Sequence, residues 1–205
     1  MYDLVIFDLD GTLIDSIGDI ADALNRTLGS SLSDGQVARF VGAGVHELLR
    51  RAGARDNLDD VARQYRAAYA AQPVRHTRPY LGVKETLRAI ACDKAVATNK
   101  PGGLARTIVD KLGLSGEFAA VLGEDDVGRK KPDPLIVDIL RGKLGVERAR
   151  TLYVGDSLVD AATADAAGVD LCLVTYGYEE VAAVRAAAAK FRIDRFDALL
   201  PILAA

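Results

Sequence analysis

The chain has 205 residues, of which 50% are hydrophobic and 27% are charged, and its formal net charge is -3. This is the composition of a globular protein large enough for one fold plus a sizeable insert, and its charge gives no reason to expect nucleic acid or a membrane surface as a partner. No long apolar run occurs, and no basic leader precedes one, so we expect no signal peptide, no membrane-spanning helix and a cytoplasmic protein. Cys92 and Cys172 lie in separate apolar runs, and we expect both to be free thiols.

Short apolar runs alternate with longer helical patterns along the chain. Each run is almost continuously apolar, which is typical of strands covered on both faces of a parallel sheet. The expected strands are 4–9, 94–99, 119–123, 151–155 and 170–174. The expected helices between them are 83–92, 102–113, 133–144 and 159–167, and an alanine-rich helix follows at 181–190. The alternation predicts an α/β fold with a doubly wound parallel sheet.

The interval between the first two strands breaks this rhythm. Residues 16–80 contain helical patterns and no convincing strand, and they are too many for a simple crossover. We therefore predict an all-helical cap domain at 16–80, inserted into an α/β core made of 1–15 and 81–205.

Polar side chains follow the predicted strands at the edge where open parallel sheets bind ligands. Asp8 and Asp10 leave the first strand two residues apart, so both carboxylates can point to the same side. Two neighbouring carboxylates repel unless a cation or a proton lies between them. Gly11 allows a tight backbone beside a ligand, and Thr12 is a supporting hydroxyl. The alternative is an acidic turn in which an aspartate side chain bonds to Thr12.

A second acidic pair follows the strand at 151–155. Asp156 ends that strand, and Asp160 lies about one helical turn later. One alternative is that Asp156 or Ser157 simply caps the next helix. The oxygens of Asp8 and Asp156, with the backbone carbonyl of Asp10, suit Mg²⁺, and His46 and His76 are isolated, so no softer site competes.

Cationic and hydroxyl groups complete the predicted site. Lys131 precedes a proline, which restricts its backbone and directs its ammonium, although Lys130 could exchange roles with it. Thr98 and Asn99 stand between a strand and a helix start, where they can bind a phosphate oxygen or cap the helix. Gly42 and Gly44 could form a glycine-rich helix start that receives an anionic group, or a plain turn.

The segments FDLDGTLIDS, ATNKP, KKPDP and VGDSLVDAATADAAG resemble, in this order, the four motifs of the haloacid dehalogenase-like hydrolases. The resemblance implies a Rossmann-like core with an inserted cap, a Mg²⁺ cofactor and phosphoryl transfer. It implies that Asp8 is the nucleophile and Asp10 the acid and base, that Thr98 holds a phosphoryl oxygen, and that Lys131 stabilises the phosphate. It also implies that Asp156 binds the metal and that Asp160 supports it.

Within that family, TNKP and VTYGYEE look similar to bacterial phosphoglycolate phosphatases. We therefore expect the substrate to be a small phosphorylated metabolite, with 2-phosphoglycolate as the first choice. We expect the protein to be a monomer or a homodimer. The alternatives are a β-phosphoglucomutase-like mutase, a pyrophosphatase or nucleotidase, and a non-catalytic phosphate-binding protein.

Overall fold

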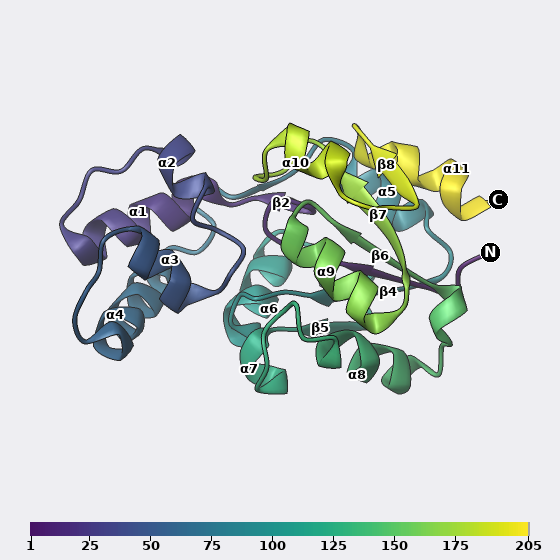
Figure 1. Ribbon diagram of the computed structural model, residues 1–205, viewed down its shortest axis with the longest axis horizontal. Helices are drawn as coiled ribbons and strands as arrows, with labels where there is room; N and C mark the ends of the chain where they lie inside the picture. Colours follow the sequence, from purple (N-terminus) through teal and green to yellow (C-terminus); the bar gives the residue numbers. More distant parts are fainter. Residues whose placement is uncertain (205) are drawn as a thin grey trace.

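The computed structural model describes residues 1–204, and a six-stranded parallel sheet forms its centre (Figure 1). The strand order is β5-β4-β1-β6-β7-β8, with every neighbouring pair parallel. The strands are β1 (Leu4–Phe7), β4 (Asp93–Ala97), β5 (Ala120–Leu122), β6 (Thr151–Gly155), β7 (Asp170–Val174) and β8 (Phe191–Ile193). The first strand of the sequence thus lies in the interior of the sheet, as in a doubly wound fold.

Helices cover both faces of the sheet because the apolar strands alternate their side chains between them. Val5 and Phe7 of β1 belong to one apolar cluster and Leu4 and Ile6 to the other. The first cluster packs under α5 (Val83–Ala89), α6 (Gly102–Lys111) and α11 (Leu199–Ala204). The second packs under α8 (Leu135–Leu144), α9 (Leu158–Ala167) and α10 (Val181–Ala186). The short helix α7 (Glu124–Val127) precedes α8.

Four helices between β1 and β4 stand to one side of the sheet, at the end opposite to both termini (Figure 1). They are α1 (Ile17–Leu28), α2 (Asp34–Ala38), α3 (Val45–Arg51) and α4 (Leu58–Ala71). We call this group the cap. A short antiparallel pair, β2 (Ile14–Asp15) and β3 (Arg78–Pro79), stands where the chain enters and leaves it.

The parallel sheet and its flanking helices confirm the predicted fold class, and several element bounds differ from the sequence-based expectation. The expected helix 181–190 ends at Ala186, and the strand β8, which was not expected, follows it. The region 16–80 was expected to hold no strand, yet Arg78 and Pro79 pair with Ile14 and Asp15. The limits of the two domains stay predictions.

Cys92 is half-buried and Cys172 is buried, and both are free thiols. Among residues 1–204, no helix combines the length and apolar character that crossing a bilayer requires.

Candidate active site

The turn after β1 presents two aspartates at the edge of the sheet. The amides of Thr12, Leu13 and Ile14 all donate to the carbonyl of Leu9, which closes the chain into a tight loop. Gly11 sits in this loop with φ of 85°, a left-handed conformation that favours glycine. A Cβ at Gly11 would lie 2.4 Å from Asp156 Oδ2, so the close approach of the two segments also requires glycine here.

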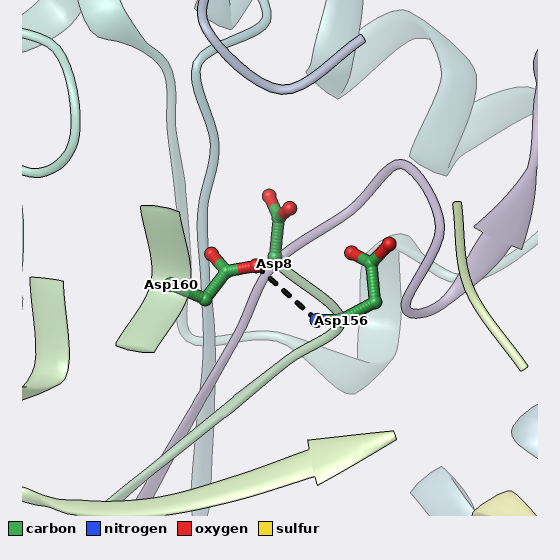
Figure 2. A group of neighbouring side chains, drawn as sticks. All are labelled: Asp8, Asp156 and Asp160. Atoms are coloured by element: carbon green, nitrogen blue, oxygen red, sulfur yellow. Dashed lines mark hydrogen bonds between the residues drawn. The ribbon is translucent and has the colours of Figure 1, made fainter. Parts of the chain in front are cut away.

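Three buried carboxylates converge at this edge (Figure 2). Asp8, Asp156 and Asp160 each offer one oxygen, and these oxygens lie within 4.8 Å of one another. Figure 2 shows the carboxylates of Asp8 and Asp156 pointing the same way, whereas Asp160 reaches toward the backbone of Asp156. The carboxylate of Asp10 is not a member of this group in the described residues.

The two oxygens of Asp160 are already occupied by donors. Oδ2 accepts from Ser157 Oγ (2.6 Å) and from the amides of Ser157 and Asp156 (3.1 and 3.2 Å). Oδ1 accepts from Lys131 Nζ (2.8 Å) and Tyr153 Oη (3.1 Å). Asp160 therefore positions Lys131 and the 156–157 backbone, and it has little capacity left for a metal. Its Ser157 contacts also form the capping box at the start of α9, so the capping alternative and the supporting role are both present.

Asp156 is held differently. Oδ1 accepts from Thr12 Oγ1 (3.1 Å) and Oδ2 accepts from the amide of Tyr178 (2.8 Å). The expected supporting hydroxyl of Thr12 thus orients Asp156. One bond to each oxygen leaves lone pairs free, since a carboxylate offers about four acceptor positions.

Lys131 is the ammonium that faces the nucleophile candidate. Its Nζ lies 2.8 Å from Asp8 Oδ1 and 2.8 Å from Asp160 Oδ1, with the side chain 2% exposed. Lys130 is exposed and donates to the carbonyl of Ala43 in the cap (3.1 Å). The geometry therefore favours Lys131 over Lys130 as the lysine at Asp8.

Burial dominates the electrostatics of this cluster. It raises the pKa of Asp8 to about 7, although Lys131 counteracts it. Burial, with Asp160 and Asp8 nearby, raises the pKa of Asp156 well above its ordinary value. Burial would lower the pKa of Lys131, but Asp160 and Asp8 raise it well above the usual range. One ammonium thus pairs with two of the three buried carboxylates, and such a set favours a further cation.

The cluster fits a divalent metal ion. Asp8 Oδ1 is buried and has ion-pair contact with Lys131 but no hydrogen bond of good geometry. Asp156 has free acceptor capacity, and carboxylate oxygens are the donors that hard cations prefer. Asp8 and Asp156 are the ligands that the hydrogen bonds leave available, while Asp160 is not.

Asp10 points away from this cluster toward the cap. Its carboxylate accepts from Lys100 Nζ at 3.0 and 3.1 Å and from Ser16 Oγ. The sequence assigned no role to Lys100, which is the lysine of the TNKP segment. The TNKP position was the available signal, yet the contact joins residues 90 positions apart.

Thr98 and Asn99 behave differently from each other. Thr98 is buried beside Asp8 in the wall of one cavity, and its Oγ1 accepts from the amide of Lys100 (3.1 Å). Asn99 uses both amide protons, to the carbonyls of Gly42 (2.9 Å) and Lys131 (3.1 Å). In this structure the Asn99 side chain ties the cap to the Lys131 backbone, and its role in binding a phosphate oxygen stays a prediction.

A cavity of about 60 Å³ opens between the core and the cap beside these groups. Gly42 and Gly44 line it, with φ of 111° and 86°, and α3 begins directly after Gly44. The cavity is also lined by Asp8, Asp10, Thr98, Lys100 and Lys131 from the core, and by Ile20, Val45, Leu48, Tyr65, Arg66 and Tyr69 from the cap.

Known proteins are similar to this chain in sequence and in fold. The family model described as haloacid dehalogenase-like hydrolase matches residues 5–174. The phosphoglycolate phosphatase of Rhodospirillum rubrum is 42% identical over 90% of this chain and 85% of its own length. The phosphoglycolate phosphatase of Aquifex aeolicus is 36% identical over 85% of each chain. The crystal structure of a predicted phosphoglycolate phosphatase from Haemophilus somnus matches with a TM-score of 0.89 and 31% identity, over 98% of this chain and 97% of that one.

Proposed function

The chain belongs to the haloacid dehalogenase-like hydrolase family and is a phosphoric monoester hydrolase, and we propose that it cleaves 2-phosphoglycolate through an aspartyl-phosphate intermediate with Mg²⁺ as cofactor. The observation that carries the proposal is the ammonium of Lys131, 2.8 Å from Asp8 and 2.8 Å from Asp160, at the wall of a cavity that Asp10 also lines. A nucleophile, a charge-neutralising cation and an acid candidate thus meet at one place.

Two displacements account for the hydrolysis. In the first, an oxygen of Asp8 bonds to phosphorus, the ester P–O bond breaks, and Asp10 gives a proton to the leaving oxygen. In the second, Asp10 takes a proton from water, the water oxygen bonds to phosphorus, and the bond to Asp8 breaks. Splitting the reaction in this way replaces one difficult step with two easier ones. Lys131 offsets charge on the phosphoryl oxygens, and the Thr98 hydroxyl donates to one of them.

Asp8, Asp156 and the backbone carbonyl of Asp10 would hold the Mg²⁺ ion, whose charge would stabilise the phosphoryl oxygens in both steps. Asp160 contributes by holding Lys131 and the backbone of Asp156, which orients the ligand indirectly.

The smaller of the two cavities beside Asp8 and Asp10 has room for a small leaving group. About 60 Å³ is room for roughly four water molecules. That space matches the CH₂–COO⁻ group of phosphoglycolate. A second cavity of about 300 Å³ also borders Asp8, Asp10 and Asp156, so cavity volume alone does not exclude a larger leaving group. The relatives described above carry the name phosphoglycolate phosphatase, which favours the same substrate.

The test is phosphate release from 2-phosphoglycolate, β-glucose 1-phosphate, pyrophosphate and nucleoside monophosphates, with and without Mg²⁺. We expect selective release from 2-phosphoglycolate that depends on Mg²⁺. Rapid acid quenching of a reaction with ³²P-labelled substrate should leave a hydroxylamine-sensitive label on the wild-type protein and none on Asp8→Asn.

Other outcomes separate the alternatives. Conversion of β-glucose 1-phosphate into its isomer without net phosphate release would identify a mutase. Preferred phosphate release from pyrophosphate or nucleotides would support the proposed phosphatase mechanism but would identify a different substrate. Binding without any turnover would identify a phosphate-binding protein.

A further inference from the structure

Lys100 carries a buried ammonium that the two displacements do not use. Its side chain is 6% exposed, and Nζ lies 3.0 and 3.1 Å from the two oxygens of Asp10. The same ammonium lies 4.5 Å from the centroid of the Tyr69 ring on α4. Lys100 therefore stands between the core and the cap, in contact with one residue of each.

The order of bonds in the substrate determines which substrate group lies near Lys100. The phosphoryl group must meet Asp8, and the leaving oxygen must meet Asp10. Asp10 lies in the wall of the cavity that Lys100 and Tyr69 also line, so a group attached to that oxygen can extend into this cavity. A group one or two bonds beyond the leaving oxygen is therefore within reach of the Lys100 ammonium.

The other cations that line this cavity in the described chain have different partners. Lys131 is held between Asp8 and Asp160 on the phosphoryl side. Arg66 is 38% exposed and faces Glu124 at 4.0 Å. The remaining cap wall includes Ile20, Val45 and Leu48, and apolar groups cannot compensate the desolvation of an anion. Lys100 is the buried cation best placed for a second negative charge.

We propose that Lys100 determines specificity by binding the carboxylate of the substrate, exchanging its partner Asp10 for the ligand. This inference rests on the proposed function, and it explains how the active site would select a substrate whose leaving group is anionic. The exchange leaves the buried ammonium paired in both states, and the ammonium offsets the desolvation of the substrate carboxylate. It also frees the Asp10 oxygens to meet the leaving oxygen, which couples recognition to the position of Asp10.

The test compares 2-phosphoglycolate with 2-hydroxyethyl phosphate, in which a neutral alcohol replaces the carboxylate. Lys100→Gln keeps an N–H donor for Asp10 and removes the charge, and Lys100→Met removes both. Lys143→Met is the matched control, because it removes the same charge from an exposed position on α8 outside the cavity. Circular dichroism establishes that each variant is folded, and kcat and KM are measured for both substrates.

We expect the wild-type protein and Lys143→Met to prefer 2-phosphoglycolate. In Lys100→Gln the ratio of kcat/KM between the two substrates should fall by about 10- to 100-fold, the usual effect of losing one hydrogen bond to a charged group. The ratio isolates recognition, since damage to Asp10 affects both substrates alike.

An unchanged ratio in both Lys100 variants, with phosphate still released from 2-phosphoglycolate, overturns the role of Lys100 and leaves the proposed function intact. A wild-type protein that releases phosphate equally from the two substrates overturns the carboxylate recognition. Absence of phosphate release from every substrate overturns the proposed function itself, and this inference with it.

Discussion

Replacing Asp160 and Asp156 by asparagine should change the stability of the metal-free protein in opposite directions. Asp160 accepts from three donors on Oδ2 and from two on Oδ1, including the Lys131 ammonium. An asparagine has one oxygen, so its NH₂ group must face either an ammonium or two backbone amides. Either orientation sets donors against donors. Asp160→Asn therefore breaks a buried ion pair and leaves hydrogen-bond donors unmatched.

Asp156→Asn meets a different environment. The asparagine oxygen can accept from the amide of Tyr178, and its NH₂ can donate to the hydroxyl of Thr12, which accepts as readily as it donates. The substitution also removes one of the three mutually repelling carboxylates. Burial raises the pKa of Asp156 well above normal, so the charged form is unfavourable here, and a neutral side chain relieves that penalty.

The magnitudes follow from these environments. Breaking one partner of a buried pair costs about 3–5 kcal/mol. For a chain of this length each kcal/mol shifts Tm by about 2–4 °C, so Asp160→Asn should lower Tm in EDTA by roughly 10 °C. Relief of repulsion at Asp156 should raise Tm by a few degrees, from about 1–2 kcal/mol.

Thermal unfolding at pH 8, in EDTA and in millimolar MgCl₂, measures both effects. Asp165→Asn is the matched control, an exposed aspartate on the same helix as Asp160. Mg²⁺ should raise Tm of the wild-type protein and the control but not of Asp156→Asn. A Tm of Asp160→Asn equal to that of the wild-type protein in EDTA would refute the hydrogen-bond argument. A full Mg²⁺-dependent rise in Asp156→Asn would remove Asp156 from the metal site.

Three further predictions concern the nucleophile, the metal and pH. Asp8→Asn should lose at least about 1000-fold in kcat while circular dichroism shows it folded, since no other group takes over covalent attack; a wild-type rate would exclude Asp8 as the nucleophile. EDTA should abolish phosphate release and Mg²⁺ should restore it, because Lys131 pairs with Asp8 and Asp160 and no cationic side chain of residues 1–204 pairs with Asp156; full activity after rigorous chelation contradicts the metal assignment. Burial raises the pKa of Asp8 to about 7 from 3.8, so its contribution to stability is present below pH 4 and lost as the pH rises through 7. In EDTA, Tm of the wild-type protein minus Tm of Asp8→Asn should therefore fall between pH 4 and 7, and a difference independent of pH would contradict this reasoning.

The sequence predicted the central strands of the sheet and the site residues that follow them. The expected strands at 151–155 and 170–174 match β6 and β7 in full, because each is a buried apolar run that ends at a polar residue or a turn. The order of motifs placed Asp8, Thr98, Lys131 and Asp156 at neighbouring strand ends, and the structure brings them together. Chain order and the geometry of a parallel sheet sufficed for this part.

Local propensity was a poorer guide at the sheet edge. The run VAAVRAAAAK has strong helix formers throughout, yet the helix ends at Ala186. The next segment pairs Phe191–Ile193 with β7 instead, and adding this strand to the sheet outweighs the local helix propensity. No local pattern in 181–190 reports such a pairing.

The roles of Lys100 and Asn99 depend on contacts that sequence spacing does not reveal. Lys100 meets Asp10 from 90 residues away, and Asn99 meets the carbonyl of Gly42 from 57 residues away. Both residues lie in the TNKP segment, where the sequence favoured a phosphate site or a helix cap for Asn99 and assigned no role to Lys100. Only the position of the cap distinguishes these two roles from the observed bond between Asn99 and Gly42.

Asn99 makes more hydrogen bonds to the core than to the cap, and this difference separates the groups that carry out the chemistry from those that select the substrate. Its amide makes two bonds to the backbone of Lys131, at 2.7 and 3.1 Å, and one to the cap at Gly42. Separation of the cap would break the single bond and leave Lys131 held against Asp8. The core can thus keep its charged groups in place while the cap admits a ligand, and preorganised charges need not be rebuilt in each cycle. Lys100 is placed differently, because it contacts Asp10 in the core and Tyr69 in the cap, so separation of the cap would remove one of its two contacts.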